Sequence, residues 1–159
     1  MVCRDYRPYG RPLDADTLVI ASSFSGNTEE TLASFRHALG SSARVCAVTA
    51  GGELTAEAMA AGCPLVSLSS PWPGFQPRAA TGFFVGAIAR LGVAEGLIEG
   101  GLSIFEALDR HVAGLEDVDV EAAALAERIQ GRIPVIYAST VFASPVARVI
   151  KIKFNENGK

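Results

Sequence analysis

The chain of 159 residues lacks several features that would assign it to a special class of protein. Its three cysteines, Cys3, Cys46 and Cys63, are odd in number and match no metal-ligand spacing, so we interpret them as reduced thiols and expect no metal. Residues 1–10 contain no apolar stretch and do not resemble a signal peptide. The longest apolar stretch, residues 79–94, is too short to span a bilayer. We therefore expect a cytoplasmic protein without a membrane partner.

The chain also has only a small excess of charge of one sign. The formal net charge is −3, and like charges form no block anywhere in the chain. Because a nucleic-acid backbone binds to basic patches, we expect no nucleic-acid partner. Hydrophobic residues make up 49% and charged residues 19%, which is typical of a globular protein, and the length suits one domain of ordinary size.

The N-terminal half of the chain alternates between strand and helix patterns. Continuous apolar runs with β-branched residues predict buried strands at residues 17–22, 43–50 and 64–68. The segments between them predict helices at residues 27–39 and 53–61, each followed by a glycine. This alternation predicts the α/β fold class, with a parallel sheet and right-handed crossovers.

The second half of the chain begins with a loop rich in proline and glycine. A helix that is apolar nearly all round follows at residues 78–91, and we expect it to be buried. Further patterns predict helices at residues 103–113, 120–129 and 144–154, and a buried strand at residues 133–139.

This layout predicts an incomplete piece of a two-domain protein. We expect residues 1–100 to form a first α/β domain that lacks its N-terminal strand and loop. Residues 101–131 then form a helical connection, and residues 132–159 begin a second domain of the same kind.

The stretch after the first predicted strand is rich in small hydrogen-bonding residues: Ser23, Ser25, Gly26, Asn27 and Thr28. It precedes a helix, whose first N–H groups and dipole form an anion site. The hydroxyl groups can donate to phosphate oxygens, and glycine lets the backbone approach the ligand. This stretch contains no lysine, which suits the binding of a single phosphate monoester better than that of a triphosphate. We predict that these five residues bind a substrate phosphate.

The alternative for the same stretch is a helix cap. Ser25 or Asn27 would cap the helix, with Glu29 or Glu30 in its first turn. One capping residue would suffice for that purpose, so the cluster favours phosphate binding.

The loop resembles two families, the flavodoxins and the sugar isomerase (SIS) domains. Other motifs favour the second: "RDY" near Asp5, "TAGGEL" at residues 49–54, "PGFQPRAA" at residues 73–80, "IPVIYAS" at residues 133–139 and the terminal "FNENGK". Together with "SFSGNTEETL", these motifs are similar to those of the dual-specificity phosphoglucose/phosphomannose isomerases.

This resemblance implies a fold and a reaction. It implies an SIS-type parallel sheet in a partial first domain, followed by the first strand and helix of a second SIS domain. The family interconverts glucose 6-phosphate or mannose 6-phosphate with fructose 6-phosphate through an enediolate. It uses no cofactor and is commonly a homodimer.

The resemblance also implies roles for two further residues. Arg78 matches the active-site arginine of a "QPRA" segment, and Glu156 matches the proton-abstracting base of a "NENAK" segment. From the residues alone, Arg78 starts a predicted buried helix, an expensive place for a guanidinium unless an anion meets it. A surface ion pair is the alternative for Arg78, and solvation is the usual state of a terminal glutamate.

The chain departs from the family pattern at both ends. The family's earlier "GGS" loop and its later ring-opening histidine and lysine have no counterpart here, and we expect His37 and His111 to be surface residues. We therefore expect little turnover from this chain alone. A non-catalytic sugar-phosphate-binding module and a flavodoxin-like FMN carrier remain the rival interpretations.

Two smaller questions stay open at this point. The pair Gly51 and Gly52 suits the lining of a sugar pocket as well as an ordinary turn between strand and helix. Trp72 and Phe75 favour packing within their loop over stacking on a sugar.

Overall fold

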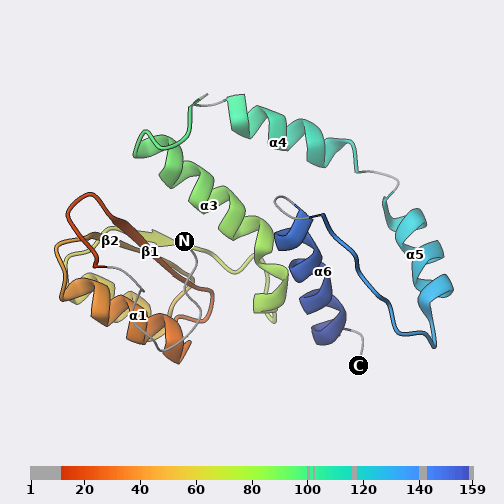
Figure 1. The fold of residues 1–159 in the computed structure, drawn as a ribbon, viewed down its shortest axis with the longest axis horizontal. Coiled ribbons are helices and arrows are strands. Elements are labelled where there is room, and N and C mark those ends of the chain that lie inside the picture. The colour runs from red at the N-terminus through yellow and green to blue at the C-terminus, as the bar shows by residue number, and fades with distance from the viewer. Residues whose placement is uncertain (1–11, 100, 102, 116–117, 140–142, 158–159) are drawn as a thin grey trace. The chain divides into compact units, whose positions relative to one another are not determined.

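The computed structural model describes residues 12–99, 101, 103–115, 118–139 and 143–157. The chain divides into two compact units, Met1–Leu97 and Ile98–Lys159, and most of their elements are labelled in Figure 1. The predicted "RDY" motif near Asp5 lies outside the described residues. Among the described helices, none has the length and apolar character needed to cross a membrane.

The first unit is built on a parallel sheet of three strands in the order β1-β2-β3. The strands are β1 (Leu18–Ser23), β2 (Arg44–Thr49) and β3 (Leu65–Ser67), at the positions that the apolar runs predict. The register pairs Ser23 with Thr49, and Thr49 with Ser67. The carboxyl ends of all three strands therefore lie at one edge of the sheet, where the loops to the following helices begin.

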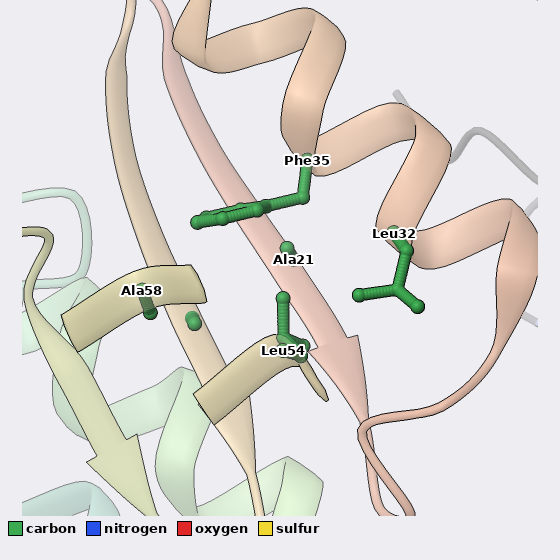
Figure 2. Packing of buried hydrophobic residues seen from close by; sticks show 6 residues of the cluster. Ala21, Leu32, Phe35, Leu54 and Ala58 are labelled. Atoms are coloured by element: carbon green, nitrogen blue, oxygen red, sulfur yellow. The ribbon is translucent and has the colours of Figure 1, made fainter. Parts of the chain in front are cut away.

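Helices cover both faces of this sheet. On one face lie α1 (Glu29–Leu39) and α2 (Gly52–Ala60), and on the other lies α3 (Thr81–Ala94), which follows a short 3₁₀ turn at Pro77–Ala79. The residues between the sheet and the first two helices form one core cluster (Figure 2): Ala21, Leu32, Phe35, Ala47, Leu54 and Ala58. A second cluster packs α3 against the sheet through Val48, Leu68 and Ala87, with Ile20, Phe24, Ala50, Val66, Phe84 and Leu91 around them. Successive strand residues such as Ala47 and Val48 thus point to opposite faces.

The prediction that the third helix is buried all round is wrong. One side of α3 packs on the sheet through Ala87, with Phe84 and Leu91 beside it, and Ala89 and Gly92 are also buried. Phe83, Val85 and Ile88 are exposed instead. The physical reason is that a helix at the outside of a three-layer unit has only one neighbour, whatever the character of its outer face.

The second unit consists of helices in its described part: α4 (Ser103–Ala113), α5 (Val118–Ile129) and α6 (Ala143–Asn157). The helical pair and the last helix are therefore confirmed. The strand predicted at residues 133–139 is not formed, and Ile133 and Tyr137 are 91% and 92% exposed. A strand exists only through hydrogen bonds to a neighbour, and no described segment pairs with these residues. The predicted domain division at residues 100 and 131 stays a prediction.

Leu54 offers a test of the packing between α2 and the sheet. Its side chain is fully buried, so Leu54→Ala should lower the free energy of unfolding by about 2–5 kcal/mol through lost burial and a cavity. Met59→Ala on the same helix is the control, because Met59 is 69% exposed and should change stability by less than about 0.5 kcal/mol. Urea denaturation followed by circular dichroism measures both values. Equal effects of the two substitutions would contradict this packing.

Candidate functional site

The candidate site lies at the carboxyl edge of the sheet, where ligands of open α/β folds bind. Two connections meet there. We call residues 23–28, which join β1 to α1, the hydroxyl loop, and residues 49–52, which join β2 to α2, the glycine turn.

The hydroxyl loop gathers its three side-chain hydroxyl groups around Ser23. The Ser23 Oγ lies 2.8 Å from the Thr28 Oγ1 and 3.5 Å from the Ser25 Oγ. It also accepts the Gly26 N–H at 3.1 Å, and the Ser25 Oγ accepts the Asn27 N–H at 3.2 Å. Ser23 is buried, whereas Ser25 and Thr28 are exposed. The structure thus brings the five predicted loop residues together, with Ser25 and Thr28 at the surface.

The helix-cap alternative for this loop is wrong. The residue at the N-cap of α1 is Thr28, and its side chain makes no capping hydrogen bond. Ser25 and Asn27 precede that position, so neither of them caps α1. The hydroxyl groups instead bond to one another and to amides of the loop itself, which leaves the cluster without a capping role.

The glycine turn packs directly against the hydroxyl loop. Gly26 has φ +69°, and a Cβ at this position would lie 1.8 Å from the carbonyl oxygen of Gly51. Gly52 has φ +70°, and a Cβ there would lie 2.2 Å from the carbonyl oxygen of Ser25. Both glycines are therefore required by a close approach of two backbones as well as by their φ angles. The glycine pair thus forms the turn between strand and helix, with a close approach to the hydroxyl loop, and a direct contact with a sugar stays a prediction.

Backbone hydrogen bonds join the two connections further. The Ala50 N–H donates to the carbonyl of Phe24 at 3.0 Å, and the Leu54 N–H donates to the carbonyl of Gly26 at 2.9 Å. Thr49 is fully buried beside them, and its Oγ1 donates to the Gly51 carbonyl at 2.9 Å. The sequence analysis missed Thr49, although a polar residue at the end of a buried strand and before two glycines is a usable signal.

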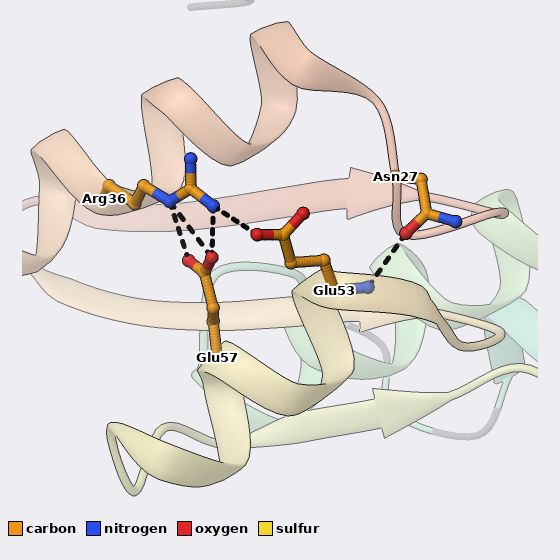
Figure 3. Close-up of polar contacts among 4 residues, drawn as sticks. All are labelled: Asn27, Arg36, Glu53 and Glu57. Carbon is orange, nitrogen blue, oxygen red and sulfur yellow. Dashed lines mark hydrogen bonds and ion pairs between the residues drawn. The ribbon is translucent and has the colours of Figure 1, made fainter.

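Asn27 has a partner that its sequence position does not reveal. Its Oδ1 accepts the N–H of Glu53, in the first turn of α2, at 2.9 Å (Figure 3). Nine residues further on, Arg36 of α1 donates from Nε to both carboxylate oxygens of Glu57, at 3.0 and 3.1 Å, and from Nη2 to Glu53 at 2.7 Å. The hydrogen bond to Glu57 is the main cause that raises the pKa of Arg36 above its ordinary value. The start of α2 is thus attached both to the hydroxyl loop and to α1.

The loop that carries Arg78 is attached to the hydroxyl loop through aromatic rings. The ring of Phe75 lies 5.4 Å from that of Phe24, 5.1 Å from Trp72 and 5.7 Å from Phe83, measured between centroids. These distances suit favourable aromatic pairs, and they confirm the loop packing predicted for Trp72 and Phe75. Arg78 lies between Phe75 and Phe83 in the chain, on the 3₁₀ turn. It is exposed, so the argument that nominated it from the cost of burial is wrong.

The remaining predicted residues lie elsewhere. Glu156 is an exposed residue of α6, in the second unit. His37 on α1 and His111 on α4 are exposed, which confirms that they are surface residues. Within the described ranges, no group of three or more His, Cys, Asp or Glu side chains is arranged to hold a metal ion.

A parallel sheet between two layers of helices, with hydroxyl groups and glycines at its carboxyl edge, defines an α/β unit compatible with an SIS domain. Comparison with known proteins identifies relatives of the chain. The chain is 35% identical over 148 residues to the bifunctional phosphoglucose/phosphomannose isomerase of Aquifex aeolicus, across 92% of this chain and 43% of that protein. It is 36% identical over 160 residues to the protein of the same name from Thermoplasma acidophilum, across 99% and 47% of the two chains.

A third relative carries a different name. The D-glucosamine-6-phosphate 4-epimerase of Sulfolobus acidocaldarius is 31% identical over 156 residues, across 97% of this chain and 48% of that protein. No protein-family profile and no solved structure matches the chain. The chain spans less than half the length of these curated relatives. The resemblance to the phosphoglucose/phosphomannose isomerase family that the motifs indicate is confirmed.

Gly26 provides a test of the contact between the two connections. Gly26→Ala should lower the free energy of unfolding by about 3 kcal/mol or more, because the new methyl group forces the Gly51 carbonyl away. Gly62→Ala is the matched control: Gly62 has φ +64° but no atom within 4 Å of the added Cβ, so only the backbone cost of about 1–2 kcal/mol applies. Urea denaturation compares them, and an equal loss in both variants would refute the close approach.

Proposed function

We propose that the hydroxyl loop holds the phosphate group of a hexose 6-phosphate. The observation that carries this proposal is the meeting of three hydroxyl groups at 2.8 and 3.5 Å beside the start of α1, a helix of 11 residues. Hydroxyl groups donate to phosphate oxygens, and a helix N-terminus favours a negative charge. Neither Ser25 nor Asn27 occupies the N-cap position of α1, so capping does not compete for these two residues.

The present hydrogen bonds suggest how a phosphate enters this loop. The amides of Gly26 and Asn27 donate to the Oγ atoms of Ser23 and Ser25. A phosphate oxygen is a stronger acceptor than a hydroxyl oxygen, so it takes over these amides, and the hydroxyl groups rotate to donate to it. Ser23, Ser25, Gly26, Asn27 and Thr28 then surround the phosphate. The loop supplies no lysine, which fits a monoester rather than a nucleotide triphosphate.

We propose further that the protein is an aldose–ketose isomerase, acting on glucose 6-phosphate, mannose 6-phosphate and fructose 6-phosphate. In this reaction a base removes the proton from C2 of the open-chain aldose, and the electron pair passes into an enediolate. Return of a proton to C1 gives the ketose, so C2 is oxidised and C1 is reduced without a cofactor. Glu156 is the proposed base, and Arg78 is the proposed group that stabilises the enediolate charge. As the family resemblance implies, the active protein is a homodimer.

The names of the relatives support the substrate class more strongly than the reaction. Two of them are named as isomerases of phosphohexoses, and one is named as an epimerase of an amino-hexose 6-phosphate. All three names share a hexose that carries a phosphate. A phosphorylated hexose is therefore the feature common to these names, and a 4-epimerase is the second candidate function. A binding module without turnover is the third interpretation, and an FMN carrier is the fourth.

Substitutions in the hydroxyl loop test the phosphate site. Ser25→Ala, and more strongly the double variant Ser23→Ala with Thr28→Ala, should weaken glucose 6-phosphate binding by about tenfold or more, the usual value of hydrogen bonds to a charged group. Isothermal titration calorimetry measures the Kd, with glucose as the ligand that lacks the phosphate. Ser41→Ala is the control, because the Ser41 Oγ also donates and accepts in a half-buried site, 2.6 Å from the Ala38 carbonyl, but away from the loop. Unchanged affinity in both loop variants would refute the site.

Substitutions of the two catalytic candidates test the reaction. In a coupled isomerase assay, on this chain or on a longer polypeptide that contains it, Glu156→Gln should lower kcat by about 10²–10⁴-fold, the usual contribution of a general base. Arg78→Met should also lower kcat while the Kd for glucose 6-phosphate changes little. Arg132→Met, on an exposed residue near the end of α5, is the control. Binding without any isomerase turnover would favour the binding module, turnover of glucosamine 6-phosphate alone would favour the epimerase, and bound flavin with absorbance near 450 nm would favour the FMN carrier.

A further inference from the structure

Glu53 of α2 is bound both by the hydroxyl loop and by α1. The backbone N–H of Glu53 donates to the Oδ1 of Asn27, while its carboxylate accepts from Arg36 at 2.7 Å. Glu57, one turn further along α2, receives both the Nε and the Nη2 of Arg36 (Figure 3). The first two turns of α2 are therefore bound by side chains of the hydroxyl loop and of α1.

The ion pair between Arg36 and Glu53 is a poor candidate for a role in overall stability. The two side chains are 53% and 55% exposed, and exposed pairs contribute little to the free energy of unfolding. The Glu57 side chain is less exposed, at 25%. The first unit contains a second pair of this kind, between Arg44 and Glu95 at 2.6 Å. Arg44 begins β2, at the end of the strand opposite to the site. The Arg36 pairs differ from the Arg44 pair in their position, because they hold the first two turns of α2.

The position of α2 determines the shape of the hydroxyl loop. The glycine turn leads directly into α2, and its Gly51 carbonyl touches Gly26 so closely that no Cβ fits between them. A shift of α2 along its axis therefore moves this carbonyl against or away from the loop. Such a shift also breaks the bonds from Ala50 to Phe24 and from Leu54 to Gly26.

From this geometry we propose that Asn27 and Arg36 are positioning residues: they dock α2 on α1, and the docked glycine turn keeps the hydroxyl loop in its phosphate-binding shape. Asn27 thus serves the site through its side-chain oxygen on α2, and through its backbone amide toward the phosphate. This proposal rests on the proposed phosphate site, and it assigns to Arg36, two turns away from the loop, an effect on ligand affinity.

Amide hydrogen exchange tests the positioning without any ligand. In the full chain, Asn27→Ala should speed exchange of both the Gly26 and the Ala50 amide by about tenfold, and Arg36→Met should speed it by about threefold. In both variants the exchange rate of the sheet amide of Ala47 should change less than about twofold. Asn27→Asp keeps an acceptor oxygen at the same place and should restore exchange to near the wild-type rate. Arg44→Met removes the comparable ion pair and should leave the loop amides unchanged. Wild-type exchange of these loop amides in both Asn27→Ala and Arg36→Met would overturn the proposal. So would equal acceleration at Ala47, since that indicates general destabilisation.

Calorimetry with glucose 6-phosphate then connects the loop shape to binding. Arg36→Met should weaken affinity by about threefold and Asn27→Ala by about tenfold, in proportion to their exchange rates, whereas Arg44→Met should have no effect. If exchange accelerates and Ser25→Ala weakens binding, but Arg36→Met and Asn27→Ala bind normally, the positioning role is refuted. If Ser25→Ala and the Ser23/Thr28 double variant also bind glucose 6-phosphate normally, the proposed phosphate site is refuted. The hydrogen-exchange rates alone then test whether Asn27 and Arg36 dock α2.

Discussion

The contact between Gly26 and the Gly51 carbonyl is the constraint on which the first unit's functional edge depends. Two backbones approach there more closely than any side chain permits, and each of the two connections supplies a glycine with positive φ. The register of the sheet makes this approach possible, because Ser23 at the end of β1 lies opposite Thr49 at the end of β2. The hydroxyl groups therefore sit on a base formed by close main-chain contacts.

The two faces of the sheet contribute differently to this base. On one face, Phe35 and Leu54 lock α1 and α2 into a shared core, so the two helices whose first turns flank the site move with the sheet. On the other face, Phe24 leaves the hydroxyl loop and joins the cluster around α3, where its ring also meets Phe75. The hydroxyl loop thus contacts both layers of helices, and this accounts for the one large aromatic residue among its small polar residues.

Much of this unit could be predicted from the sequence, because local patterns determine it. Apolar runs gave the three strands to within a few residues, and the cluster after β1 marked the loop before any geometry was known. The partner of Asn27 could not be predicted, since it lies 26 residues away and depends on how two helices pack. The predictions of a fully buried α3, whose Phe83 is exposed, and of a strand at residues 133–139 are wrong for the same reason. Periodicity indicates which residues a segment can bury, but its tertiary neighbours determine which residues it does bury.

The aromatic contacts beside the site also have an optical consequence. Trp72 is the one tryptophan in the sequence, and its ring meets the edge of Phe75, which in turn lies against Phe24 of the hydroxyl loop. The indole is 59% exposed, so its emission is sensitive to solvent as well as to these rings. The tryptophan fluorescence of the native chain therefore comes from a ring that is linked to the hydroxyl loop by two side-chain contacts. It reports on that edge of the molecule without an attached dye.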